Sequence, residues 1–146
     1  MMERIIEKTD DGSATLFVPE LNEHYHSTKG ARTESQHIFI DMGFKASSAT
    51  IPRILEIGFG TGLNAWLTLE EAERSGRNVH YTGLELYPLE WQMVEQLGYI
   101  EQPAAIDLFR AIHTSPWEEE ISFTSEASLI SGTLCSGLSK AAPSRE

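Results

Sequence analysis

The residues best suited to chemistry lie between Glu56 and Asn64. Gly58, Gly60 and Gly62 occupy alternate positions there, directly after a short apolar stretch. Glycine lets the backbone approach a ligand more closely than any residue with a Cβ atom. A helix that begins after the last glycine points its free amide groups and its positive end at the same ligand. The segment therefore predicts a turn that holds a bound molecule.

Two acidic residues accompany this turn. Glu56 precedes the first glycine by two positions, and Glu85 stands near the end of the next apolar stretch. A carboxylate at position 56 repels a pyrophosphate but attracts a cation, and an acid at position 85 is placed to accept hydrogen bonds from ribose hydroxyls. Together with a G-x-G-x-G spacing that lacks a lysine, this favours S-adenosylmethionine over NAD or ATP. The alternative is a tight structural turn beside two solvated acids.

The predicted cofactor site combines the two acids with the loop and the first polar residue after it. Asn64 either bonds the cofactor or caps the helix. The full set is Glu56, Gly58, Phe59, Gly60, Thr61, Gly62, Asn64 and Glu85.

The surrounding pattern predicts an α/β fold. Apolar periodicity indicates helices over residues 34–44, 63–75, 89–97 and 104–111, and strands over 1–8, 15–18, 53–57, 79–86 and 121–123. Gly76 is expected to end the second helix, and Pro88 to stand in the first turn of the third. Strand, glycine loop, helix and strand form a βαβ unit, which implies a parallel sheet with a right-handed crossover.

Composition bounds the function. The chain has 146 residues, a formal net charge of −11 and a hydrophobic fraction of 40%. These values fit a single globular domain and make sequence-independent nucleic-acid binding over the whole surface a poor expectation, although a local basic patch stays open. The single cysteine, Cys135, excludes an intrachain disulfide. No signal-peptide core or membrane-spanning stretch is recognised, so a cytoplasmic protein without membrane contact is expected.

A resemblance to a known family rests on three segments. The phrase from Glu56 to Asn64 is similar to the cofactor loop of the tRNA 5-methylaminomethyl-2-thiouridine methyltransferases, which are the MnmD proteins and the N-terminal domain of the MnmC proteins. Residues 23–39 resemble the family's element before the first Rossmann strand, and residues 81–88 resemble its second strand with its acid. The resemblance covers roughly residues 14–120.

The resemblance implies a class I S-adenosylmethionine-dependent methyltransferase, with a Rossmann-like parallel sheet of which only the N-terminal part is present. The implied domain plan is a β-hairpin extension that covers the pocket over residues 1–50, cofactor-binding βαβ units over 51–121, and an atypical serine-rich tail over 122–146, for which disorder is one interpretation. The implied substrate is tRNA, methylated on the aminomethyl group of its wobble uridine, without a metal. The resemblance also places four residues in the substrate pocket: Tyr25, Ser27, Glu34 and His37.

Several alternatives stay open. The family's later aspartate phrase has no counterpart after about residue 121, so the catalytic residue is unknown and the chain is truncated or divergent there. Methylation of a protein or small molecule, or cofactor binding without catalysis, are the competing hypotheses. A sheet edge left without its next strand predicts self-association. The pair His24 and His26, with His37, has metal-ligand spacing but lacks a cysteine, and no metal is expected.

Overall fold

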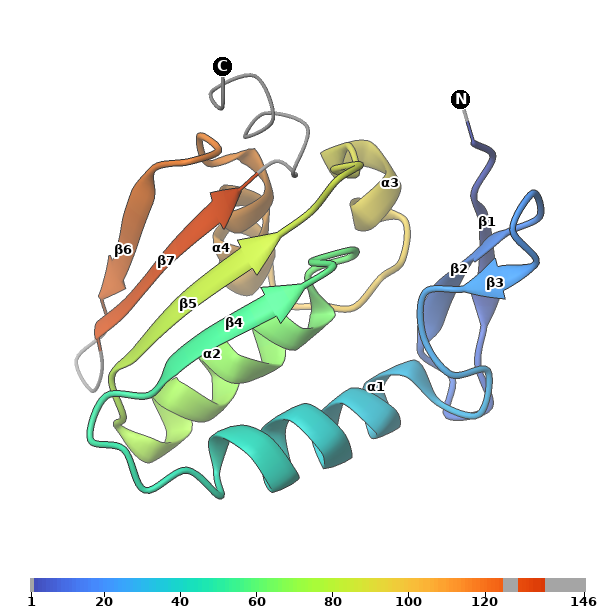
Figure 1. The fold of residues 1–146 in the computed structure, drawn as a ribbon. Helices are drawn as coiled ribbons and strands as arrows, with labels where there is room; N and C mark the ends of the chain where they lie inside the picture. The colour runs from blue at the N-terminus through green and yellow to red at the C-terminus, as the bar shows by residue number, and fades with distance from the viewer. Residues whose placement is uncertain (1, 125–128, 136–146) are drawn as a thin grey trace, which may run out of the picture.

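The computed structural model describes residues 2–124 and 129–135. A small antiparallel sheet opens the chain, in the order β1-β2-β3 (Figure 1). Its strands are β1 (Ile5–Lys8), β2 (Ala14–Val18) and β3 (Glu23–His24). The predicted N-terminal hairpin is thus confirmed, and a short third strand extends it.

The second sheet carries the predicted βαβ unit. Its strand order is β4-β5-β7-β6, with β4 parallel to β5, β5 parallel to β7, and β6 antiparallel to β7. Helix α2 (Leu63–Ser75) crosses over from the first to the second of these strands. The strands are β4 (Arg53–Ile57), β5 (Val79–Leu84), β6 (Glu120–Thr124) and β7 (Leu129–Cys135).

The predictions about this sheet are confirmed only in part. The parallel pairing of β4 with β5 is as expected, whereas the antiparallel strand β6 makes the whole sheet mixed. The serine-rich tail contributes β7, which pairs with β5 and covers the edge that was expected to stay open. Strand β7 forms because it pairs with strands on both sides, although its own sequence shows only a weak pattern of apolar residues. Residues 125–128 and 136–146 of that tail lie outside the described residues.

Some of the predicted helix bounds agree with the structure, and others do not. Helix α2 has the predicted bounds, and Gly76 ends it with a left-handed φ of 68°. Helix α3 (Trp91–Glu95) is shorter than expected, because Glu90 has extended backbone and leaves Pro88 outside the first turn. Proline takes that position instead in α4 (Pro103–Thr114). The predicted helix 34–44 begins earlier, as α1 (Ala31–Ser35), and continues as the π-helix η1 (Gln36–Phe44).

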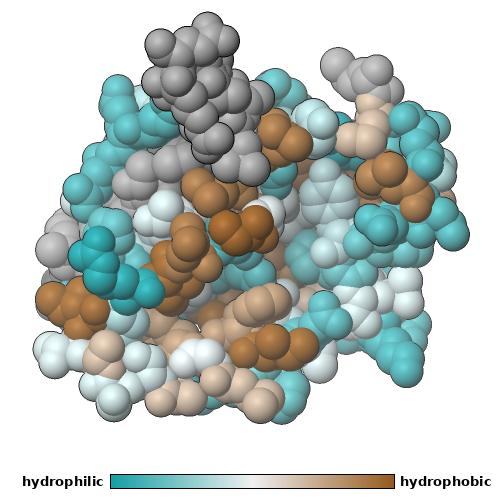
Figure 2. All heavy atoms as spheres, viewed as in Figure 1, coloured by the Kyte–Doolittle hydropathy of each residue, from teal (hydrophilic) through white to brown (hydrophobic). Residues whose placement is uncertain are grey.

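Helices cover one face of the second sheet. Trp66 of α2 and Phe109 of α4 pack against each other, with ring centroids 5.5 Å apart, in the same buried cluster as Val79 of β5. On the opposite face Leu55 and Ile57 of β4 are 63% and 73% exposed. Figure 2 shows hydrophobic residues gathered across this side of the molecule. Among the described helices, none has the length and hydropathy needed to cross a membrane.

The start of α1 is fixed by the turn between β1 and β2. The first three amides of the helix, at Ala31, Arg32 and Thr33, donate in turn to Thr9 Oγ1 (3.0 Å), Ser13 Oγ (2.9 Å) and Asp11 Oδ2 (2.9 Å). A helix leaves these amides without intrahelical partners, so side chains from the turn stabilise the helix end. The same contacts join the small sheet to the helix that borders β4.

Asp11 is expected to be the most sensitive residue of this junction. Its carboxylate also accepts from Thr33 Oγ1 and from the Ser13 amide, and these hydrogen bonds hold the pKa of Asp11 well below its usual range, against the effect of burial. Asp11→Ala should lower the free energy of unfolding at neutral pH by about 1–2 kcal/mol, measured by urea denaturation.

The pH dependence gives a second check. Because the folded-state pKa is depressed, the stabilisation is present above the unfolded-state pKa of about 4 and is lost as pH falls below it. The difference between wild type and Asp11→Ala should therefore shrink in acid. Asp10→Ala, which removes the neighbouring carboxylate, is the control. Equal losses from the two variants would contradict the capping role.

Candidate functional site

The turn from β4 to α2 runs through three glycines with left-handed backbone. Their φ angles are 83° at Gly58, 57° at Gly60 and 78° at Gly62, a region that residues with a Cβ atom rarely adopt. A Cβ on Gly60 would lie 3.2 Å from the Tyr25 ring, and one on Gly62 would lie 2.7 Å from His113 Nε2. A Cβ on Gly58 would meet nothing within 4 Å. The first glycine therefore leaves open space, while the other two are crowded.

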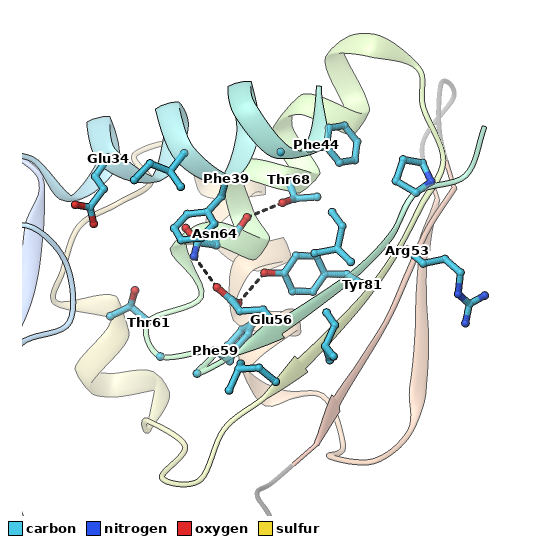
Figure 3. Close-up of a pocket in the computed structure, with 18 of the residues that line it drawn as sticks. Glu34, Phe39, Phe44, Arg53, Glu56, Phe59, Thr61, Asn64, Thr68 and Tyr81 are labelled. Atoms are coloured by element: carbon cyan, nitrogen blue, oxygen red, sulfur yellow. Dashed lines mark hydrogen bonds between the residues drawn. The ribbon is translucent and has the colours of Figure 1, made fainter. Parts of the chain in front are cut away.

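A cavity of about 690 Å³ lies between this turn, β4 and the η1 helix (Figure 3). Six of the predicted cofactor residues line it, and they are Glu56, Gly58, Phe59, Gly60, Thr61 and Asn64. Two of the predicted substrate-pocket residues, Tyr25 and Glu34, line it as well. The structure therefore brings most of the predicted site to one cavity.

Four predicted residues lie outside its lining. Gly62 sits at the helix start over His113, and Glu85 lies beside the glycine turn. Ser27 accepts a hydrogen bond from the Lys29 amide in its own turn. His37 lines a separate groove that also contains Asp11 and Arg32.

The separation of His37 from Glu34 follows from the helix that carries both. Glu34 lies with Ile38, four residues on, toward the cavity beside β4, whereas Thr33 lies with His37, also four residues on, toward the other groove. The segment resembled a single pocket wall in sequence, but its two sides border two different cavities.

Glu56 is the acid of the cavity whose pKa is clearly shifted. Tyr81 Oη donates to its Oε1 at 2.6 Å, and Asn64 Nδ2 donates to its Oε2 at 2.6 Å. The pKa of Glu56 is raised to about 7, mainly by burial and in smaller part by the charge of Glu85, while the hydrogen bonds from Tyr81 and Asn64 oppose the shift. Near neutral pH the site thus holds a carboxylate close to its titration point.

Glu85 reaches the glycine turn from the end of β5. Its Oε1 accepts from the Gly60 amide at 2.6 Å, and its Oε2 accepts from the Tyr87 amide at 3.1 Å. A carboxylate has about four lone-pair positions, so these two bonds leave acceptor capacity. Glu85 therefore both fixes the loop and keeps the ability to bind hydroxyl groups.

The histidines near the hairpin have protein partners. His24 Nε2 lies 2.8 Å from Glu7 Oε2, and His26 Nδ1 lies 3.1 Å from Thr15 Oγ1. Over residues 2–124 and 129–135, no group of three His, Cys, Asp or Glu side chains is arranged to hold a metal ion.

Sequence reasoning missed two residues of the site, Tyr81 and His113. Tyr81 shares an inward face of β5 with Val79, as the burial alternation shows, and this alternation was the available signal. His113 stands on α4, far along the chain, among the rings of Phe59, Trp91 and Phe109. Burial lowers the pKa of His113 to about 4, so a neutral ring supports the glycine turn.

Comparisons with known proteins point to one group of relatives. The chain is 34% identical over 88 residues to the tRNA 5-methylaminomethyl-2-thiouridine biosynthesis bifunctional protein MnmC of Delftia acidovorans. The aligned region covers 56% of this chain and 14% of that protein. It is 29% identical over 123 residues to the MnmC protein of a Polaromonas species, covering 80% of this chain and 19% of that protein. None of the protein-family models matches. The resemblance predicted from the sequence is thereby confirmed.

A solved structure shows the same fold. The crystal structure of MNMC2 from Aquifex aeolicus matches with a TM-score of 0.69 and 24% identity, over 100% of this chain and 46% of that one. The chain therefore spans less than half of that structure and less than a fifth of the MnmC proteins reported above. The match shows that the chain shares the mixed α/β fold of that structure.

The crowding behind Gly62 yields a stability prediction. Gly62→Ala places a methyl group against His113, which the surrounding rings hold in place, and it also forces a left-handed backbone on alanine. We expect a loss of about 2–4 kcal/mol in the free energy of unfolding.

Gly98→Ala is the matched control, because Gly98 has a φ of 66° and a Cβ there would meet nothing within 4 Å. This variant should lower the free energy of unfolding only through the strained left-handed backbone, by about 1–2 kcal/mol. Chemical denaturation of both variants measures the difference. Equal losses would mean that His113 does not restrict the turn.

Proposed function

We propose that this chain, as a homologue of part of the MnmC proteins, binds S-adenosylmethionine at the glycine turn and serves methyl transfer. The observation that carries the proposal is the pair of carboxylates on either side of the turn. Glu56 faces the cavity, and Glu85 contacts the turn through the Gly60 amide at 2.6 Å. One acid suits a positive ligand group and the other suits ribose hydroxyls.

The residues present fit this cofactor. Gly58 leaves open space at the turn, and the following helix α2 begins directly after Gly62, so its first amides face the same region. No lysine or arginine stands within the turn to hold a pyrophosphate. Glu56 would bind the cationic part and Glu85 the ribose. When bound, S-adenosylmethionine supplies a methyl group to an acceptor nitrogen as its carbon–sulfur bond breaks.

We infer that the fold is the N-terminal part of a class I methyltransferase Rossmann domain. The parallel pair β4 and β5, joined by α2, supports this, because a glycine turn at the carboxyl end of a parallel strand is where such folds bind adenosine cofactors. The antiparallel sheet formed by β1, β2 and β3 then acts as the extension over the pocket, with Tyr25 against Gly60.

The proposed acceptor is the aminomethyl group of the tRNA wobble uridine, in line with the names of the MnmC relatives. The chain's own contribution to that step is to keep the cofactor in place and to exclude water along the cavity wall formed by Ile38, Phe39 and Phe44. No described residue is assigned as the acceptor's base. The net charge of −11 favours a second candidate, methylation of a protein or small-molecule acceptor.

Isothermal titration calorimetry with S-adenosylhomocysteine tests the cofactor site. Glu85→Ala removes the hydrogen bonds to ribose, each worth about 1.5–3 kcal/mol before compensation, and should weaken binding at least ~10-fold with the circular dichroism spectrum unchanged. Glu73→Ala on the exposed side of α2 is the control. Unchanged affinity in Glu85→Ala would contradict the ribose role.

Methyl-labelled S-adenosylmethionine then separates the acceptors. Transfer of label to tRNA that carries 5-aminomethyl-2-thiouridine supports the first candidate, and transfer to other acceptors but not to this tRNA supports the second. Binding of S-adenosylhomocysteine without transfer to any acceptor would leave a cofactor-binding unit and contradict both.

A further inference from the structure

Glu56 is held by two donors from two different elements. Tyr81 on β5 and Asn64 on α2 each donate one hydrogen bond to a different carboxylate oxygen (Figure 3). Both bonds measure 2.6 Å, as expected for charge-assisted contacts to an ionised acid. An amide NH₂ group only donates hydrogen bonds, so Oε2 accepts from Asn64, and Tyr81 donates to Oε1 while that oxygen carries no proton.

Asn64 acts through Glu56 and not by itself. Its Oδ1 is buried and has no hydrogen-bond partner among the residues that the structure describes, while its Nδ2 is committed to the carboxylate. An acceptor that neither solvent nor a protein donor reaches is poorly placed to meet a ligand. Asn64 was expected either to bond the cofactor or to cap the helix, and these contacts favour an indirect role through Glu56.

Tyr81 is likewise committed to the acid. Its side chain is buried, and its hydroxyl lies at the cavity wall within reach of Glu56 alone among the described hydrogen-bond partners. The ionised acid next to it holds the pKa of Tyr81 well above its usual range, in addition to the effect of burial. The phenol thus remains a donor over the whole working range of pH.

Among the residues that the structure describes, no cationic side chain lies beside Glu56. Glu85 lies beyond the glycine turn and opposes the ionisation of Glu56. The remaining ionisable residues that line the cavity come from the hairpin, from α1 and from the start of β4, and they are Tyr25, His26, Glu34 and Arg53. Figure 3 shows Arg53 directed away from Glu56 at the other end of the cavity.

We propose that Tyr81 and Asn64 are positioning residues that keep Glu56 ionised and directed at the cavity, and that they make the site selective for ligands with a positive charge. This inference rests on the proposed function, because it assigns the cationic part of the cofactor to Glu56. It adds that the selectivity depends on two neutral donors that do not touch the ligand.

A pH dependence follows from this arrangement. A cation prefers the carboxylate form of Glu56, whose pKa lies at about 7. Affinity should be highest above that pKa and should fall as pH drops through it, by about tenfold for each unit below it. A neutral ligand, 5′-deoxy-5′-methylthioadenosine, should bind with little change over the same range.

The test measures the dissociation constants of S-adenosylmethionine and of methylthioadenosine by calorimetry, between about pH 5.5 and 8.5. Tyr81→Phe and Asn64→Leu each remove one donor that lowers the pKa of Glu56. The midpoint, which is the pH at which the affinity for S-adenosylmethionine begins to fall, should therefore move to higher pH in both variants. Glu56→Gln should remove the pH dependence and the preference for the charged ligand together.

Tyr99→Phe is the matched control, because it removes a phenol hydroxyl from a half-buried tyrosine, one that donates to the Ala14 carbonyl at 2.9 Å. Its midpoint should equal that of the wild type. Unshifted midpoints in Tyr81→Phe and Asn64→Leu, with wild-type affinity for both ligands retained above the midpoint, would overturn the positioning role. Failure of the wild-type chain to bind either adenosine ligand would instead contradict the proposed function, and this inference with it.

Discussion

The backbone of the turn after β4 is the constraint on which the rest of the structure depends. Gly58, Gly60 and Gly62 all adopt left-handed φ angles, and the space around the last two is already filled by Tyr25 and His113. This close packing brings the N-terminal hairpin and α4 against the same few peptide groups. A side chain at Gly60 would therefore disturb Tyr25 after the hairpin, and one at Gly62 would disturb His113 of α4.

Two acids give this turn its chemical character. Glu85 fixes the loop through the Gly60 amide, and Glu56 lies on the cavity side, where its ionisation depends on Tyr81 and Asn64. In the proposed function, Glu85 binds the ribose of the ligand and Glu56 its positive group. The local architecture, more than the overall negative charge, therefore determines which ligand the chain is suited to bind.

Local signals predicted the elements nearest to the turn and failed farther away. The bounds of β4 and α2 and the role of Gly76 follow from apolar runs and a glycine cap, which act within a few residues. The strand β7 depends on pairing with β5, and Tyr81 meets Glu56 only because two strands lie in register. His37 lines a different groove from Glu34, because sequence proximity does not reveal which side of a helix faces which cavity.

Amide chemical shifts of the glycine turn, recorded by ¹H–¹⁵N NMR during titration with S-adenosylhomocysteine, test the central claim most directly. The account predicts large, saturable shifts at Gly58 and Gly60 and at the Asn64 side-chain amide, with small shifts in the groove that contains Arg32 and His37. Saturable shifts confined to that other groove, or no shifts at the turn at millimolar ligand, would contradict it.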